Sequence, residues 1–524
     1  MSGPVPQARS LADIYPEAAL DVQRTRWQNL VSRFESLYGH PPAFIARSPG
    51  RVNIIGEHID YSLYSVLPMA ITADCLIAVS PTAAAGSDTY KVRLANVLPE
   101  KFAAKDLDLP VKGDVEIDST VHEWTNYFKC GLKGATELLR KKHGEGFVPT
   151  GMEVLLDGSV PAGGGLSSSA AFTSTTALAV MVANGEKNID KKELTELAIV
   201  SERGVGVNSG GMDQSASVFS QRGSALFVSF TPTLTAKPVS FPTTNPELCF
   251  VIAQSFVTAD KFVTGPIHYN LRVVECSLAA AYLNAVLNAP GHTLPTDSSP
   301  LGVSLHGFHE TYFALREADG QKVPTAVPEQ LALLLALTRA TLTKDEGYTR
   351  DEVAAALGIT VDELNARFTS RFPVRAERFK LRQRAEHVFS EALRVLEFMS
   401  LLQQEPAAGS AGDTAVYNAL LGAKLNETQD SCRDLYECSC PEIDTICATA
   451  RSAGSYGSRL TGAGWGGCSV HLVPADKVDA VKEAWEKEYY SKMDLTPEQR
   501  EGAVVVSRPG SGSAVFVIGE GSLS

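Results

Sequence analysis

The sequence lacks an apolar run long enough to cross a membrane, which takes about 20 residues. Its longest such run, Leu331–Leu337, indicates a buried helix instead. The segment Met1–Arg9 has no apolar signal core, and the nine cysteines are scattered and odd in number, as is typical of a reducing compartment. We therefore expect a cytoplasmic protein that does not use a membrane.

Positive charge is also scarce, with 47 Lys and Arg against 60 Asp and Glu and a net charge of −13. Nucleic-acid binding usually requires a basic domain or stripe, so no nucleic-acid partner is expected. Thr349–Glu352 and Thr360–Glu363 are both capping boxes and predict two short helices, which is also the pattern of a DNA-binding helix-turn-helix. Acidic Asp362 and Glu363 at the start of the second helix favour a structural hairpin instead.

Cysteine and histidine patterns typical of structural zinc are missing. Cys432, Cys438, Cys440 and Cys447 form the one cluster, but its spacing has no C-x-x-C pair and no histidine lies nearby. A zinc site is therefore not expected.

What the chain does contain is a segment of three glycines and three serines, Pro161–Ala171, between a predicted strand at Met152–Leu156 and an apolar helix that Asn184-Gly185 would end. It has neither the Lys-Ser/Thr ending of a Walker loop nor the acidic residue of a dinucleotide fold. Backbone N–H groups at the start of a helix, with serine hydroxyls beside them, favour an anion. The segment predicts phosphate binding, with a flexible turn capping a core helix as the alternative.

A second segment, Ser48–Tyr61, contains Arg51, Glu57, His58 and Asp60 among apolar and turn-forming residues. Several hydrogen-bond acceptors and an imidazole in one loop suit a polyhydroxylated ligand, because each sugar hydroxyl both donates and accepts. A metal site and a merely solvated loop are the two alternatives.

Two further glycine-rich segments complete the pattern. In Asn208–Gln214 a Gly-Gly turn places Asp213 either in a cleft or at the surface, where it would cap the next helix. In Gly457–Val473 dense glycine runs into an alternating strand, which marks close approach of another group to the backbone.

These motifs, in this order, resemble those of the GHMP family of sugar and small-metabolite kinases. Pro161–Ala171 is similar to the family's phosphate loop, Gly457–Cys468 to its C-terminal glycine motif, and Gly50–Tyr61 to its galactokinase signature. The match extends over most of the chain, and the later part is most similar to the longer galactokinases of fungi and to N-acetylgalactosamine kinases. Further matching segments are Asn208–Gln214, His268–Glu275 and Ser431–Cys440.

The resemblance implies an α+β fold in two lobes, with ATP and sugar in the cleft between them. The N-terminal lobe, over residues 20–245, would resemble domain 2 of ribosomal protein S5. The C-terminal lobe, over residues 246–524, would be ferredoxin-like, with a helical insertion at about residues 290–380.

The activity that the resemblance implies is transfer of the γ-phosphate of ATP to the C1 hydroxyl of α-D-galactose in galactose catabolism, with Mg²⁺. Asp213 would be the base, and Arg51 would steady Asp213 and the transferring charge. The implied sugar-binding residues are Arg51, Glu57, His58, Asp60, Ser209, Gly210, Asp213 and Tyr269. The implied nucleotide-binding residues are Gly163, Gly164, Gly165, Ser167, Ser168, Ser169 and Lys261, and the implied Mg²⁺ ligands are Ser169 and Glu202.

Two alternatives remain open. N-acetylgalactosamine kinases share all these motifs, and some fungal relatives are galactose and ATP sensors that bind a transcriptional repressor protein. The catalytically inactive sensors lack two residues of the serine loop, whereas Ser167–Ala171 is complete here and Asp213 is present. Catalytic activity is therefore expected.

Overall fold

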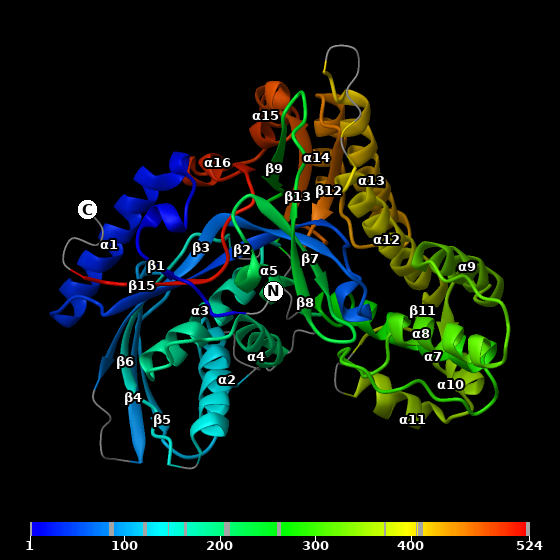
Figure 1. Cartoon of the computed structure of the whole chain (residues 1–524), viewed down its shortest axis with the longest axis horizontal. Helices are drawn as coiled ribbons and strands as arrows, with labels where there is room; N and C mark the ends of the chain where they lie inside the picture. The colour runs from blue at the N-terminus through cyan, green and yellow to red at the C-terminus, as the bar shows by residue number, and fades with distance from the viewer. Residues whose placement is uncertain are drawn as a thin grey trace.

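The structure is a computed structural model, and it describes residues 3–82, 88–118, 123–144, 146–161, 165–203, 210–258, 264–370, 374–404, 406 and 412–519. The elements form three groups in Figure 1: a larger sheet with its helices on the left, a smaller sheet with its helices at the top, and a separate group of helices on the right. None of the described helices combines the length and apolar character that a membrane span requires.

The larger sheet has seven strands in the order β1-β15-β2-β3-β6-β4-β5. Its last strand in sequence, β15, lies between β1 and β2, pairing Ala514 with Arg47. The expectation that all of residues 246–524 belong to the C-terminal lobe is therefore corrected for this strand, which is too short for its pattern to reveal its partner. The strands are β1 (Gln7–Ala8), β2 (Phe44–Ile55), β3 (Leu67–Thr82), β4 (Thr89–Asn96), β5 (Lys105–Pro110), β6 (Gly151–Gly158) and β15 (Ala514–Val517).

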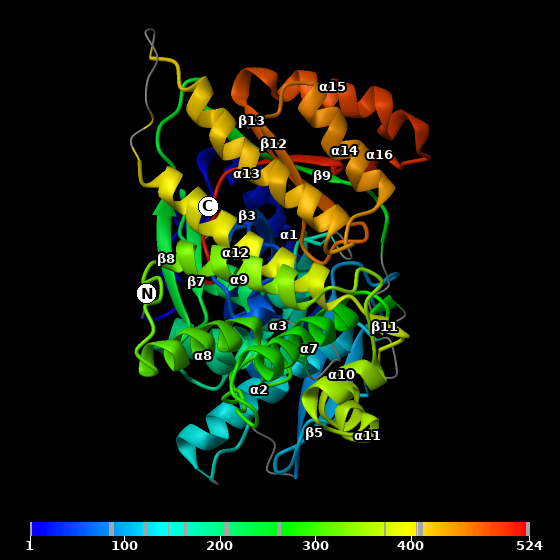
Figure 2. The same ribbon diagram turned by 90° about the vertical axis from the view of Figure 1, so that its right-hand side faces the viewer.

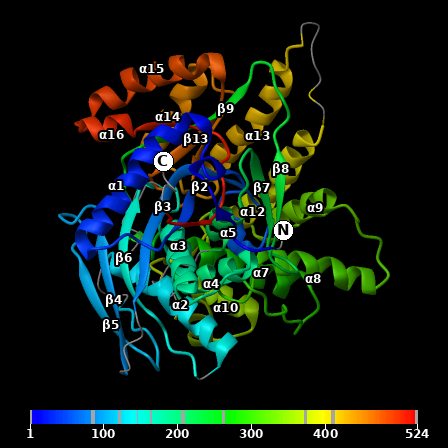
Figure 3. The same ribbon diagram turned by 60° about the vertical axis from the view of Figure 1, so that its left-hand side comes forward.

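Both faces of this sheet are covered, because successive side chains of a strand point to opposite sides. Leu76 and Ala78 of β3 pack with α1 (Leu20–Tyr38), whereas Ile77 and Val79 pack with the helices of the other face (Figure 3). Two short 3₁₀ helices, Leu11–Asp13 and Glu17–Ala19, precede α1. The helices of the second face are α2 (Thr125–His143), α3 (Ser168–Ala183), α4 (Lys191–Arg203) and α5 (Met212–Phe219).

The smaller sheet is antiparallel, with the order β12-β13-β9-β14. When the four strands are numbered by their order in the chain, their order across the sheet is 2-3-1-4. One helix precedes β12 and another precedes β14, and this combination is the ferredoxin-like arrangement. Trp485 and Ile446 cover one face, and the large apolar core covers the other. The elements are β9 (Leu248–Gln254), α14 (Pro441–Ser452), β12 (Gly457–Thr461), β13 (Cys468–Pro474), α15 (Val478–Glu488), α16 (Pro497–Glu501) and β14 (Val504–Ser507).

The third group is helical and faces the viewer in Figure 2. Both predicted capping boxes are present: the hydroxyls of Thr349 and Thr360 each accept the backbone N–H three residues on. The helices are α7 (Tyr269–Leu287), α8 (Leu305–Ala318), α9 (Val327–Thr341), α10 (Arg350–Leu357), α11 (Val361–Leu364), α12 (Leu381–Leu402) and α13 (Ala415–Asp434). The remaining strands form two antiparallel pairs, β7 (Ser224–Ser229) with β8 (Thr235–Ser240), and β10 (Tyr348–Thr349) with β11 (Arg378–Phe379).

Candidate active site

The glycine–serine segment and the C-terminal glycine motif are in direct contact, although they lie far apart in the sequence. Gly165 has φ +70°, and an added Cβ would lie 2.9 Å from the carbonyl oxygen of Thr461. Gly462 has φ +93°, and its added Cβ would overlap the backbone of Gly165. Glycine is therefore required at both positions. Gly163 and Gly164 lie outside the described residues.

The start of α3 offers hydrogen-bond donors to an anion. Ser167 precedes the helix with φ +61°, and its hydroxyl is buried with no hydrogen-bond partner among the described residues. Ser168 and Ser169 form the first turn and are partly exposed. The first N–H groups of a helix have no partner within it, so this end of α3 fits phosphate oxygens.

Arg51 of β2 joins this loop to Asp213. Its Nε and Nη2 atoms both lie 2.7 Å from Oδ1 of Asp213, and its Nη1 donates to the carbonyl oxygen of Gly165 at 2.7 Å. Arg51 is 4% exposed, whereas the Asp213 side chain keeps 21% of its surface. Asp213 lies in the first turn of α5, where the helix dipole also favours negative charge.

Asp60 lies against the same turn and is buried. Its Oδ2 accepts the N–H of Met212 at 3.4 Å, and a Cβ added to Gly210 would lie 2.5 Å from both the Asp60 Cγ and the backbone nitrogen of Tyr61. Burial, followed by the nearby charge of Asp213, raises the pKa of Asp60 to about 6. Gly210 therefore allows two carboxyl groups to share one small site.

Glu57 connects the two sheets. Its Oε2 accepts the N–H of Gly462 at 3.0 Å and a charge-assisted bond from Arg459 of β12. Arg459 is completely buried and also donates to the carbonyl oxygen of Ile54 at 3.1 Å. The pair positions the second predicted segment against the C-terminal glycine motif.

His58 and Tyr269 complete the predicted sugar-facing group. His58 has φ +59°; its Nε2 lies 3.0 Å from the carbonyl oxygen of Ala463, and its ring centroid lies 5.4 Å from that of Tyr269. Burial, followed by the negative charges of Asp60 and Asp213, raises the pKa of Tyr269 well above its usual range. The Tyr269 hydroxyl is therefore a neutral donor and acceptor beside the carboxylates.

Glu202 lies in the last turn of α4 and is 3% exposed. Its Oε2 accepts a hydrogen bond from the amide of Gln214, the residue after Asp213. A hydroxyl from Ser169 and one buried carboxylate are ligand types that Mg²⁺ accepts together with phosphate oxygens. In the described part of the chain no three His, Cys, Asp or Glu side chains gather as a metal site, and all nine cysteines are free.

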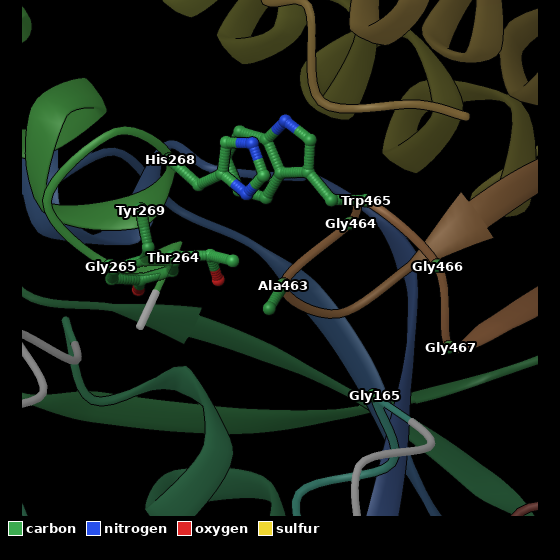
Figure 4. A pocket seen from close by; sticks show the side chains of 10 residues that line it. All are labelled: Gly165, Thr264, Gly265, His268, Tyr269, Ala463, Gly464, Trp465, Gly466 and Gly467. Carbon is green, nitrogen blue, oxygen red and sulfur yellow. The ribbon is translucent and has the colours of Figure 1, made fainter. Parts of the chain in front are cut away.

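A small, partly open pocket lies where these segments meet (Figure 4). Its walls are Gly165, the start of α7 and the turn at residues 463–467. His268 and Trp465 close one side with parallel rings whose centroids are 4.5 Å apart.

The structure thus brings together Arg51, Glu57, His58, Asp60, Gly210, Asp213 and Tyr269, and brings Gly165 and the start of α3 beside them. Ser209 and Lys261 lie outside the described residues. Sequence reasoning missed His268, Trp465 and Arg459. Arg459 carried a usable signal, because a lone arginine in a strand of apolar and small residues indicates a buried counter-ion.

Three family models match the chain. The galactokinase galactose-binding signature matches residues 32–81, the GHMP kinase N-terminal domain matches residues 126–221, and the GHMP kinase C-terminal domain matches residues 415–492. All three include segments that meet at the pocket or pack beside it.

Curated relatives match over nearly the full length. The galactokinase of Saccharomyces cerevisiae is 41% identical over 98% of both chains, and that of Schizosaccharomyces pombe is 40% identical over 95% of this chain and 96% of its own. The crystal structure of Lactococcus lactis galactokinase complexed with galactose aligns with a TM-score of 0.61 at 24% identity, covering 93% of this chain and 99% of that one. That likeness supports the two-lobed fold.

Proposed function

The chain belongs to the galactokinase family of the GHMP kinases, and its activity is ATP-dependent phosphorylation of galactose. We propose that its pocket places MgATP and α-D-galactose so that the γ-phosphate of ATP passes to the C1 hydroxyl of the sugar. The products are α-D-galactose 1-phosphate and ADP.

The observation that carries this proposal is the Arg51 guanidinium, which bonds Asp213 with two nitrogens and the Gly165 carbonyl oxygen with the third. Phosphoryl transfer depends mainly on alignment and on stabilising charge, with an acceptor for the hydroxyl proton. Asp213 is that acceptor, taking the proton of the C1 hydroxyl late in a loose transition state. Arg51 holds the carboxylate in line and offsets charge on the transferring phosphate.

The sugar lies against the predicted group on the other side of Asp213. The carboxyl of Asp60 and the hydroxyl of Tyr269 supply hydrogen bonds to sugar hydroxyls, and His58 supplies an aromatic edge, because both of its ring nitrogens are bonded within the protein. Glu57 acts partly through its backbone, because its carboxylate is already bonded by Arg459 and Gly462.

The phosphates of ATP lie at the start of α3. The unpartnered Ser167 hydroxyl and the first N–H groups of the helix bind their oxygens, while Gly165 keeps the backbone close. Ser169 and Glu202 would hold Mg²⁺, which supplies positive charge to the phosphates when bound. We also infer a cytoplasmic location, which the nine free thiols support.

The decisive experiment compares the wild type with Asp213→Asn, using MgATP with either galactose or N-acetylgalactosamine. Asp351→Asn is a matched control, because Asp213 and Asp351 are each the second residue of an eight-residue helix and Asp351 is exposed. We expect wild-type turnover on galactose, unchanged in Asp351→Asn. Asp213→Asn should lose at least a factor on the order of 10² in kcat.

Each other outcome is informative. Faster turnover of the acetylated sugar would move the substrate to N-acetylgalactosamine. Galactose binding without ADP release by the wild type would contradict the enzyme and leave a sensor. Near-normal kcat in Asp213→Asn would contradict the assigned base.

A further inference from the structure

The turn that carries the sugar-facing residues is held from outside by helix α12. We call residues 56–60 the sugar turn. Gly56 and His58 both have positive φ, +104° and +59°, so this backbone has an unusual path that needs support. Oε1 of Glu391 accepts the N–H of Gly56 at 2.8 Å and the N–H of Glu57 at 3.0 Å.

A second contact comes from the preceding turn of the same helix. Nε2 of His387 lies 2.9 Å from the carbonyl oxygen of Glu57, and Nδ1 lies 2.8 Å from the hydroxyl of Ser431. A carbonyl oxygen can only accept, so Nε2 carries the proton and Nδ1 accepts from Ser431. Burial lowers the pKa of His387 to about 3, which keeps the imidazole in this neutral form.

Glu391 is itself rigidly held. It is completely buried, and its Oε2 accepts from Nε of Arg394 at 2.8 Å and from the Thr428 hydroxyl at 2.9 Å. Burial alone would raise the pKa of Glu391, but the positive charges of Arg394 and Arg459 and the hydrogen bond from the Gly56 N–H together outweigh burial and lower the pKa to about 2. Four donors thus surround a permanently ionised carboxylate, two of them from the sugar turn.

We propose that Glu391 and His387 are positioning residues for the sugar, gripping the sugar turn through its backbone so that His58 and Asp60 meet galactose in the correct geometry. The proposal rests on the function proposed above. According to the proposal, α12 affects galactose affinity through the sugar turn, although this helix contributes no side chain to the pocket walls. ATP affinity should change little, because the nucleotide phosphates lie at α3.

The test compares Glu391→Gln and His387→Phe with the matched control His471→Phe. His471 is also completely buried, has its pKa lowered to about 3, bonds serine hydroxyls through both nitrogens and packs on an aromatic ring, that of Trp485. It lies on β13 in the other sheet, where it bonds serines of β12 and β13 rather than the backbone of the sugar turn. The readouts are the galactose Kd by calorimetry without ATP, the KM for each substrate, kcat and the thermal midpoint.

We expect both α12 variants to raise the galactose Kd and KM on the order of tenfold, with the KM for ATP changed less than twofold. His471→Phe should lower the thermal midpoint to a similar degree and leave the galactose Kd unchanged. If Glu391→Gln does not fold, His387→Phe decides the question by itself, because it keeps an aromatic ring while removing the donor to Glu57 and the acceptor for Ser431.

Two results would overturn the inference: an unchanged galactose Kd in His387→Phe, or equal rises in the KM for both substrates, which would indicate a general structural role. A wild type that does not phosphorylate galactose would instead contradict the proposed function, so the two failures are distinguishable.

Discussion

Replacing Asp60 by asparagine is expected to stabilise the sugar-free protein at neutral pH while weakening galactose binding. Asp60 is buried, and burial together with the charge of Asp213 raises its pKa to about 6, against a usual value of 3.8. At 1.36 kcal/mol per pKa unit, this difference corresponds to about 3 kcal/mol. The ionised carboxylate therefore destabilises the empty site by up to that amount, and the uncharged amide does not.

The sign follows from proton binding. Between about pH 4 and pH 6 the folded chain holds the Asp60 proton while an unfolded chain has lost it, so the free energy of unfolding falls as the pH rises. The contribution of Asp60 is complete below pH 4 and has been lost above about pH 7. The stability gained by Asp60→Asn should therefore grow from pH 4 to pH 7 and then stay constant.

Equilibrium urea unfolding at pH 5, 6, 7 and 8, followed by tryptophan fluorescence and circular dichroism together, measures this gain. Asp74→Asn is the contrasting variant, because Asp74 is also buried but is paired with Arg47 and Arg26, which lower its pKa against the effect of burial. Asp74→Asn should be less stable than the wild type at neutral pH, and this difference in the free energy of unfolding should shrink as the pH falls. A destabilised Asp60→Asn at pH 7, or a gain that shrinks as the pH rises, would refute the reasoning.

Two further outcomes follow from the geometry of the pocket. Gly210→Ala should raise the galactose Kd on the order of tenfold or more, because its Cβ would lie 2.5 Å from the Asp60 Cγ and from the Tyr61 nitrogen. The control Gly158→Ala has open space around its Cβ and should leave the Kd unchanged. Equal Kd values for the two variants by calorimetry would contradict this prediction. Glu202→Gln should raise the free Mg²⁺ concentration needed for half-maximal turnover on the order of tenfold without changing galactose binding, and an unaltered Mg²⁺ titration would remove Glu202 from the metal site.

Several features could be read from the sequence because the physics behind them acts over a few neighbouring residues. The strand at Met152–Leu156 and the apolar helix after the serines follow from side-chain periodicity and from glycine's backbone freedom. The capping boxes at Thr349 and Thr360 form as predicted, because each needs only a hydroxyl and a carboxylate three residues apart. The order of the motifs was sufficient to indicate the kinase family and the residues around Asp213.

Other features were decided only by the tertiary structure, since they join residues whose separation no local pattern encodes. Ala514–Val517 has the pattern of any short strand, and only the free edge of β2 made it a member of the first sheet. Glu57 was predicted to face a ligand, yet the folded chain brings Arg459 to its carboxylate. Glu391 gave no signal within its helix, because its meaning lies in two backbone N–H groups of the sugar turn. The sequence determined which local structures and which chemical groups are present. The packing of the two lobes determined which charges and backbone groups face one another, because a buried polar group bonds whichever partner the assembled fold brings within hydrogen-bond distance.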